Sequence, residues 1–270
     1  MTNKKYELTD ESMKLPNGVT VYRIKALRDF ADVKEGQLGG FVQSEYNLSH
    51  TDNAWAYHDA MVFGSARVIG NAQVYGTATV KDSAKVEDSA KVSGDAVISE
   101  FAKVCEHAEV SCSATVQGRA RVLGFASVGG KATIKDDAWV HGCASVHDYS
   151  VIGALTNLGG ITEVHNHSKI LSRGDAPASL YSNAVIRGNA SIVRPNDILV
   201  ISPLGSRYDR LTAYRNEQGG IDVTTGCFHG SLSEFRKQVR HTHGSHLYGE
   251  HYRAAIAFIK NFFGIGKGLK

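Results

Sequence analysis

The sequence predicts an all-β solenoid, a parallel β-helix wound from six-residue repeats, with an N-terminal cap and a small C-terminal α+β domain. From Ala54 to Ala144 every sixth residue is alanine, without a break. From Val62 onward an aliphatic residue stands two positions after each of these alanines, and Gly, Asp or Glu usually follows two positions later. A constant internal period of this kind is the signature of repeat architectures.

Side-chain alternation along a strand explains the repeat. Residues i and i+2 of a strand face the same way, so each alanine and its aliphatic partner point inward and the residue between them points outward. The Gly, Asp or Glu position suits a tight turn. Each repeat is therefore one short strand and one corner, and three repeats close a triangular coil of eighteen residues. We expect this coil to span residues 51–196, between a cap at 1–50 and a separate domain at 197–270.

An aliphatic residue at i is followed by a small residue at i+4, as in Val74 with Ala78 and Val80 with Ala84. This spacing resembles the hexapeptide-repeat family of left-handed β-helix proteins. In that family a small or acidic residue usually stands at i+1, whereas here it stands at i+2. The resemblance implies a left-handed parallel β-helix. The right-handed β-helix of bacterial bactofilin filaments, which also uses short Val/Gly repeats, is the alternative.

The two ends of the repeat differ. Residues 18–27 read as a strand, and residues 38–45 lead into the coil. Because the end of a β-helix exposes unpaired backbone, we expect the N-terminal segment to act as a cap. After Ile170 the phase breaks, and residues 171–182 are predicted as a loop. The repeat then resumes out of register at Ala184 and Ala190.

Residues 197–270 predict a mixture of strands and helices. Residues 198–203, 211–215 and 221–228 read as strands, with a hairpin loop at 216–220. Ser231 and Glu234 have the spacing of a capping box at the start of a helix. Apolar residues at helical spacing indicate a second, amphipathic helix: Tyr252, Ala255, Ile256, Ile259 and Phe263.

Composition narrows the class of protein. The net charge is +3, which is too small to indicate nucleic-acid binding by itself. The four cysteines do not have the spacing of a zinc site. Neither a secretion signal nor a stretch of about 18 apolar residues is present. We expect a cytoplasmic protein with free thiols and without a metal, a cofactor, a membrane partner or a nucleic-acid partner.

The outward positions of successive coils stack into three walls. One wall carries a ladder of cations that suits a polyanion or a solvated surface: Arg67, Lys85, Lys103 and Arg121, followed by Trp139. A second wall is uncharged and rich in β-branched residues, which favours sheet-to-sheet packing and predicts a homo-oligomer contact: Met61, Thr79, Val97, Thr115, Thr133 and Val151. The third wall begins with Trp55 and is mixed in character.

The densest polar chemistry lies in residues 197–270. The turn formed by Gly205, Ser206 and Arg207 offers backbone N–H groups and a guanidinium, which suit a phosphate or a carboxylate. Rings that can stack on a base follow at four positions: Tyr214, His229, His241 and His243. We predict that these seven residues bind an anionic, nucleotide-like small molecule. Two alternatives remain open: Cys227 is a nucleophile served by His229 and His241, or these residues are ordinary core and surface.

Family resemblance adds further hypotheses. Hexapeptide acyltransferases use a histidine base and bind acyl-CoA between subunits, and related carbonic anhydrases hold zinc with histidines; here His147 and His165 are expected to stack on adjacent coils. The chain also resembles uncharacterised β-helix proteins of bacterial and phage genomes over residues 21–49, 52–57, 226–235 and 241–244. The hypotheses are thus a non-catalytic scaffold that presents a domain to an anionic ligand or a host partner, an acyltransferase, and a phage protein that sequesters or cleaves a nucleotide signal.

Overall fold

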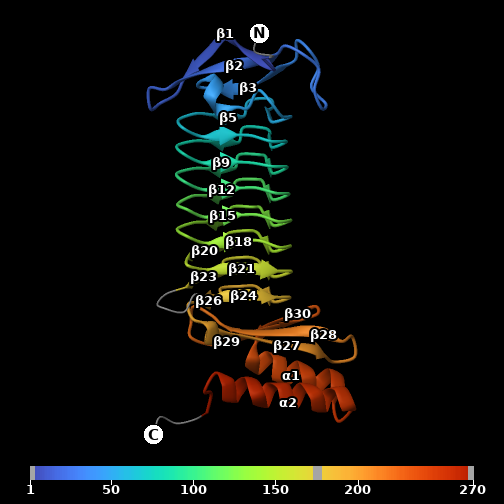
Figure 1. Cartoon of the computed structure of the whole chain (residues 1–270). Coiled ribbons are helices and arrows are strands. Elements are labelled where there is room, and N and C mark those ends of the chain that lie inside the picture. Colours follow the sequence, from blue (N-terminus) through green and yellow to red (C-terminus); the bar gives the residue numbers. More distant parts are fainter. Residues whose placement is uncertain (1–3, 173–177, 267–270) are drawn as a thin grey trace.

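The computed structural model describes residues 4–172 and 178–266. The molecule is a column in which an N-terminal β cap, a coil of parallel strands, a four-stranded sheet and two helices follow one another along one axis (Figure 1). The predicted β-solenoid and the predicted C-terminal α+β segment are both confirmed.

Three sheets form the walls of the coil within the described residues. The first has eleven strands, of which β1 and β2 are antiparallel additions from the cap: β1 (Tyr6–Lys14), β2 (Thr20–Ala26), β3 (Leu38–Val42), β5 (Met61–Val62), β8 (Thr79–Val80), β11 (Val97–Ile98), β14 (Thr115–Val116), β17 (Thr133–Ile134), β20 (Val151–Ala154), β23 (Lys169–Ser172) and β26 (Ser191–Ile192). The second has eight: β4 (Trp55–Ala56), β7 (Gln73–Val74), β10 (Lys91–Val92), β13 (Glu109–Val110), β16 (Ser127–Val128), β19 (Ser145–Val146), β22 (Glu163–Val164) and β25 (Val185–Ile186). The third has seven: β6 (Arg67–Val68), β9 (Lys85–Val86), β12 (Lys103–Val104), β15 (Arg121–Val122), β18 (Trp139–Val140), β21 (Asn157–Gly160) and β24 (Ser179–Ser182).

Strand register confirms the phase of the repeat. Val97 pairs with Thr115 and Ile98 with Val116, so neighbours in a wall are eighteen residues apart. The alanines and their aliphatic partners are fully buried along the coil, whereas the residues between them face outward. Small and branched inward residues alternate, which lets the three walls approach closely.

The corner positions explain why Gly, Asp and Glu recur. They adopt left-handed backbone, with φ of 70° at Gly94 and 58° at Asp88. A Cβ at Gly94 would lie 2.7 Å from the carbonyl oxygen of Cys112 in the next coil, so glycine is required there. Where the corner is acidic, its carboxylate accepts the N–H of the corner one coil further on, as Asp88 does from Glu106 at 3.1 Å. Acidic corners therefore bind successive coils together.

The predicted loop at residues 171–182 is wrong in part. Residues 171–172 end β23, and β24 covers residues 179–182; residues 173–177 lie outside the described part of the chain. Asn157 pairs with Ser179 and Leu158 with Leu180, so one coil is four residues longer than the others. Ala178 and Leu180 already have the spacing of the repeat and are buried, so the resumed phase begins one repeat earlier than predicted.

The N-terminal end of the coil presents carbonyl groups that lack a partner coil. Each coil donates its N–H groups to the carbonyls of the next, as Trp55 does to Ala72 at 3.1 Å. The carbonyls of the first coil therefore need donors from elsewhere. Buried Lys5 extends its Nζ to the carbonyls of Asp52 and Ala54, at 2.9 and 2.6 Å. The cap thus supplies hydrogen-bond donors.

Two further cap residues contribute to this end. Asn47, in the short 3-10 helix Glu45–Asn47, donates its amide group to the carbonyls of Gly64 and Ala66 at 3.0 and 2.9 Å. Trp55 occupies an outward position of β4 in the eight-stranded wall but is fully buried, because Phe30 and Tyr6 pack edge-on against its ring at 5.3 and 6.0 Å. The cap therefore covers the first coil from its side as well as from its end.

At the opposite end the coil presents N–H groups without acceptors, and the C-terminal sheet supplies them. Its strands are β27 (Ile198–Leu204), β28 (Asp209–Arg215), β29 (Ile221–Thr225) and β30 (Phe228–Ser231). The hydroxyl of Thr212 accepts from Val185 N–H at 3.1 Å, and the hydroxyl of Tyr214 accepts from Arg187 N–H at 3.0 Å. The carboxylate of Asp197, in the 3-10 helix Pro195–Asp197, accepts from Val193 N–H at 3.0 Å.

Two helices cover the other face of this sheet (Figure 1): α1 (Leu232–His243) and α2 (Leu247–Phe262). The predicted capping box is confirmed, because Ser231 Oγ accepts from Glu234 N–H and Glu234 returns the bond to Ser231 N–H. Buried Phe235, Val239 and Ile259 form a second core with the sheet. Within residues 4–172 and 178–266, no helix is long and apolar enough to cross a membrane.

Lys5→Met should change how stability depends on pH. Burial, together with the charge of Arg28, lowers the pKa of Lys5 from 10.5 to about 8. Above about pH 8 the unfolded chain still holds a proton that the folded chain has released, so the free energy of unfolding of the parent should rise toward pH 10. The variant lacks this rise and also removes the donor to two carbonyls, of which that of Ala54 is buried, which costs about 1–3 kcal/mol.

Urea unfolding at several pH values from 7 to just below 10 measures this difference. Higher pH is avoided because burial raises the pKa of neighbouring Tyr6. Above about pH 10 this tyrosine ionises in the unfolded chain but not in the folded one, which lowers the free energy of unfolding. Lys14→Met, at an exposed position of β1, is the matched control. Parallel stability curves for the parent and Lys5→Met would contradict the role assigned to Lys5.

Tyr214→Phe should destabilise the protein by about 1–3 kcal/mol, because it leaves the partly buried N–H of Arg187 without this acceptor. Tyr208→Phe removes a hydroxyl from a residue that is 75% exposed and should change stability little. Chemical unfolding of both variants provides the comparison. Equal stabilities would show that the hydroxyl of Tyr214 does not cap the coil.

Candidate functional site

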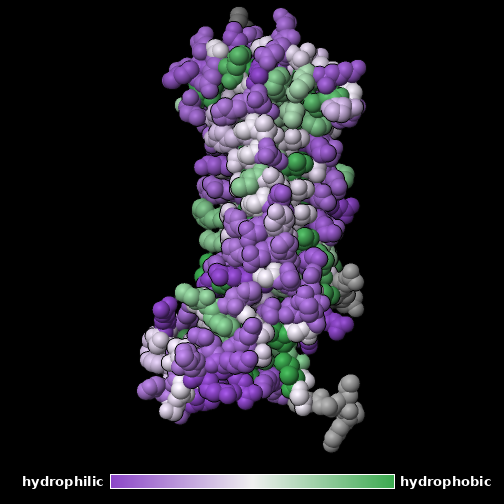
Figure 2. Space-filling view, turned by 180° about the vertical axis from the view of Figure 1, so that it is seen from behind, coloured by the Kyte–Doolittle hydropathy of each residue, from purple (hydrophilic) through white to green (hydrophobic). Residues whose placement is uncertain are grey.

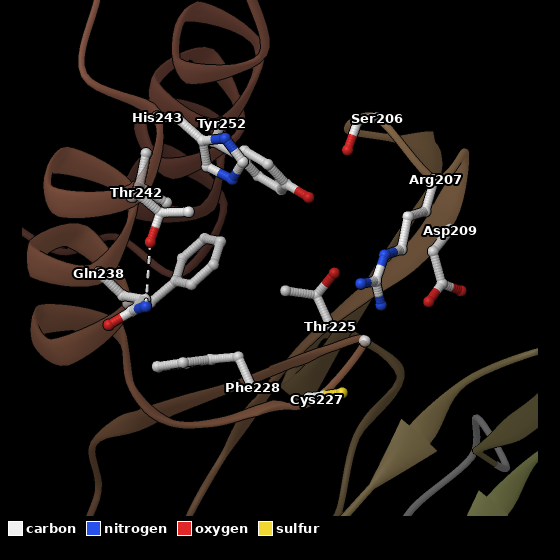
Figure 3. A pocket seen from close by; sticks show the side chains of 13 residues that line it. Ser206, Arg207, Asp209, Thr225, Cys227, Phe228, Gln238, Thr242, His243 and Tyr252 are labelled. Atoms are coloured by element: carbon white, nitrogen blue, oxygen red, sulfur yellow. Dashed lines mark hydrogen bonds between the residues drawn. The ribbon is translucent and has the colours of Figure 1, made fainter.

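A pocket of about 280 Å³ opens between α1, α2 and the turns at one end of the C-terminal sheet. We call it the Arg207 pocket. Figure 3 shows its two sides: Arg207, Asp209 and Ser206 on one, and Gln238, Thr242, His243 and Tyr252 on the other. Thr225, Gly226, Cys227, Phe228, Phe235 and Val239 complete the lining.

Aromatic rings line the helical side of the pocket. Phe228 and Phe235 have ring centroids 5.2 Å apart, and Tyr252 packs edge-on against Phe235 at 5.7 Å. The imidazole of His243 stacks on Tyr252 at 5.2 Å, with 30° between the ring planes. Rings from both helices and from β30 thus form surfaces against which a flat ligand can pack.

The turn that carries Arg207 is held against α2. Gly205 has φ of 72°, and a Cβ at this position would lie 2.1 Å from the hydroxyl oxygen of Tyr252. Only glycine allows so close an approach. The guanidinium of Arg207 is exposed and extends along the pocket beside Asp209 (Figure 3). A cation and a carboxylate therefore lie on the same side of the pocket.

Polar groups on α1 face this charged side. Gln238 donates its amide group to the hydroxyl of Thr242 at 3.0 Å, one helical turn away. Cys227 lies in the turn between β29 and β30, where its free thiol is exposed. The pocket thus combines a cation, a carboxylate, an amide, hydroxyls and a thiol around aromatic rings. This set can bind a ligand that has a ring, a hydrogen-bond donor and an anionic group.

The structure gathers only some of the predicted site residues. Ser206, Arg207 and His243 line the pocket, and Gly205 supports it. His229 and His241 line a neighbouring shallow cleft with Glu234 and Lys237, and His229 also packs against the corner at Gly188. Tyr214 is fully buried at the end of the coil, so the structure does not bring it to the pocket.

Sequence reasoning missed Asp209, Gln238 and Thr242. Gln238 and Thr242 are four residues apart on the polar face of the predicted first helix, which places them on one side of it. Asp209 stands two residues after Arg207, which lies in the turn that leads into β28. These spacings were visible, but nothing in the sequence shows that the helix lies opposite the turn.

The nucleophile hypothesis is changed by this arrangement. Cys227 lines the Arg207 pocket, whereas His241 lines the neighbouring cleft. The imidazole that shares the pocket with Cys227 is that of His243. Cys227, His229 and His241, which were predicted to act together, therefore do not line one common cavity.

The histidines of the coil form a stack, as expected. His147 and His165 have ring centroids 5.9 Å apart and 17° between their planes. Burial lowers the pKa of His147, and the neighbouring His165 contributes. His165 Nε2 is 3.6 Å from the carboxylate of Glu163, which also binds Arg210 at 2.5 Å. In the described part of the chain, no group of three or more His, Cys, Asp or Glu side chains is placed to hold a metal ion.

The cation ladder is largely engaged within the chain. Lys103 forms an ion pair with Glu87 at 2.5 Å, and this bond raises the pKa of Lys103. Arg121 packs on the ring of Trp139 at 4.7 Å, and Arg67 packs on Tyr46 at 5.0 Å. These contacts favour a solvated, internally paired wall over a polyanion site.

No protein-family model matches the chain, and no curated protein sequence matches it. The functional inference therefore rests on the chemistry of the site.

Proposed function

We propose that the protein is an oligomeric β-helix scaffold that presents a recognition domain, and that the Arg207 pocket of this domain binds a nucleotide-like small anion. The observation that carries the proposal is the convergence of an exposed guanidinium with stacked rings in one cavity. The rest of the molecule serves as a rigid support, since its core is continuous from the cap to Ile198 and Tyr214.

The chemistry of the pocket suits such a ligand part by part. A base or another flat ring packs against Tyr252 and His243. A phosphate or carboxylate accepts hydrogen bonds from Arg207, whose planar guanidinium binds such groups in a bidentate manner. Asp209 accepts a hydrogen bond from an exocyclic amine of the ligand. One oxygen of Asp209 already accepts from Arg210 N–H at 2.7 Å, so the ligand amine binds the other oxygen, which favours ligands that have such a donor.

Arg207→Ala should weaken binding roughly 10- to 100-fold, because a hydrogen bond between charged groups contributes about 1.5–3 kcal/mol. The ligand class is found first by thermal shift with a panel of nucleoside monophosphates, cyclic nucleotides and acyl-CoAs, since a ligand that binds the folded state raises the melting temperature. Calorimetric titration of the best compound into the parent and the variant then gives both affinities.

Lys85→Ala is the matched control, because it removes an exposed cation from the coil. It should bind like the parent. If no compound raises the melting temperature, or if Arg207→Ala binds as tightly as the parent, the proposal fails. Stabilisation by acyl-CoA alone, unaffected by Arg207→Ala, would instead support an acyltransferase.

The oligomeric part of the proposal rests on the uncharged wall. All six of its residues are half-buried in the single chain and none is charged. Val97 and Thr115 are directly paired at its centre. Met61, at the cap end, already packs against Val21 and Phe41. The central coils are therefore the part that supports contact with a second copy.

Val97→Lys combined with Thr115→Lys should convert the oligomer into monomers, because two unpaired ammonium groups would be buried in the contact. Light scattering coupled to size exclusion measures the mass. Ser127→Lys with Ser145→Lys places the same charges on adjacent coils of another wall and should keep the parent mass. A parent that is itself monomeric would contradict the oligomeric scaffold.

A further inference from the structure

A second cleft lies along α1, on a different side from the Arg207 pocket. It has a volume of about 470 Å³ and is lined by residues of α1, α2 and the start of β29. Arg236 and Lys237 lie four and three residues before Arg240, about one helical turn, so all three side chains reach the same cleft. Lys260 of α2 joins them. We call this surface the basic cleft.

No ion pair among the described residues balances the charge of the basic cleft. Nearby arginines have partners: Arg210 binds Glu163 at 2.5 Å, and Arg215 binds Asp197 at 3.1 Å. Among residues 4–172 and 178–266, none of the four cations of the basic cleft forms an ion pair, and no carboxylate lines it. Four like charges around one cavity repel each other and create a positive potential that attracts anions.

The nearest acidic residue of α1 does not neutralise this charge. The carboxylate of Glu234 is hydrogen-bonded to the hydroxyl and the N–H of Ser231, and Lys237 acts on it only through its more distant charge. These bonds hold the pKa of Glu234 below its usual value. The capping box therefore commits Glu234 to the helix terminus, and the basic cleft stays positive.

The floor of the basic cleft is apolar. Ile221 and Leu232 form its base, and Ile265 adds a side chain that is 43% exposed. The aliphatic stems of the lysines and arginines extend this surface. No aromatic ring of the described residues lines the cleft, so it lacks a stacking platform for a nucleobase. The occupant that fits has apolar groups as well as negative charges.

We propose that the basic cleft docks an acidic amphipathic segment of a partner protein. Carboxylates of the segment bind the forked guanidinium groups of Arg236 and Arg240, and its apolar side chains cover Leu232 and Ile265. The helices lie at the end of the column opposite the N-terminal cap (Figure 1), so a partner reaches the basic cleft without meeting the coil.

Fluorescence anisotropy with a labelled synthetic peptide tests the proposal. The probe is a peptide of about twelve residues that combines glutamates with leucines in an amphipathic helical pattern. It should bind the full chain, and binding should weaken as salt is raised. A peptide with serine in place of leucine and a peptide with lysine in place of glutamate should each bind at least roughly tenfold more weakly.

Arg236→Glu with Arg240→Glu should weaken binding of the acidic peptide by at least roughly tenfold. Arg236→Gln with Arg240→Gln is a milder second variant, and circular dichroism checks the fold of both. Lys85→Glu with Arg119→Glu makes the same charge change at exposed positions of the coil and should bind like the parent. If the peptide does not bind, or binds all variants equally, the proposal is overturned. It is also overturned if short duplex DNA or tripolyphosphate binds more tightly than the peptide through the same two arginines.

Discussion

The structure depends on the direction of its backbone hydrogen bonds. Along the strands of the parallel coil the ladder N–H groups point toward the C-terminal end and the ladder carbonyls toward the N-terminal end, so each interior coil satisfies the next. The two ends are therefore chemically different: one lacks donors and the other lacks acceptors. Unpaired buried backbone groups cost several kcal/mol, so each end needs a cap of the matching kind.

The two caps meet this requirement with side chains. At the first coil the donors are an ammonium group on Lys5 and an amide on Asn47. At the last coil the acceptors are the hydroxyls of Thr212 and Tyr214 and the carboxylate of Asp197. A buried ammonium group is tolerated because two carbonyls receive it, although its pKa falls to about 8 as a result of burial. Edge strands that would otherwise recruit further chains are closed in this way.

Capping also determines where ligand chemistry can lie. One face of the C-terminal sheet is used to close the coil, and the other is covered by α1 and α2. Cavities are left at the turns of the sheet and along α1, which borders both the Arg207 pocket and the basic cleft. Figure 2 shows one side of the column, on which hydrophobic residues reach the surface of the coil in separate patches between hydrophilic ones. The core of the coil continues to Ile198 and Tyr214, and the C-terminal segment carries the side chains that line both cavities.

The coil was determined by the sequence alone. Its period is local, since a residue's place in the repeat decides whether it is inward, outward or at a corner, and Val97 and Thr115 meet because of that period. The strands and the capping box of the C-terminal segment were also predictable, because alternation and Ser231–Glu234 spacing are local signals. Only the tertiary structure decided the rest. Tyr214 became a cap, Trp55 was buried by the N-terminal segment, and Arg207 came to face Gln238 and Thr242, because each outcome depends on how distant segments pack rather than on their own patterns.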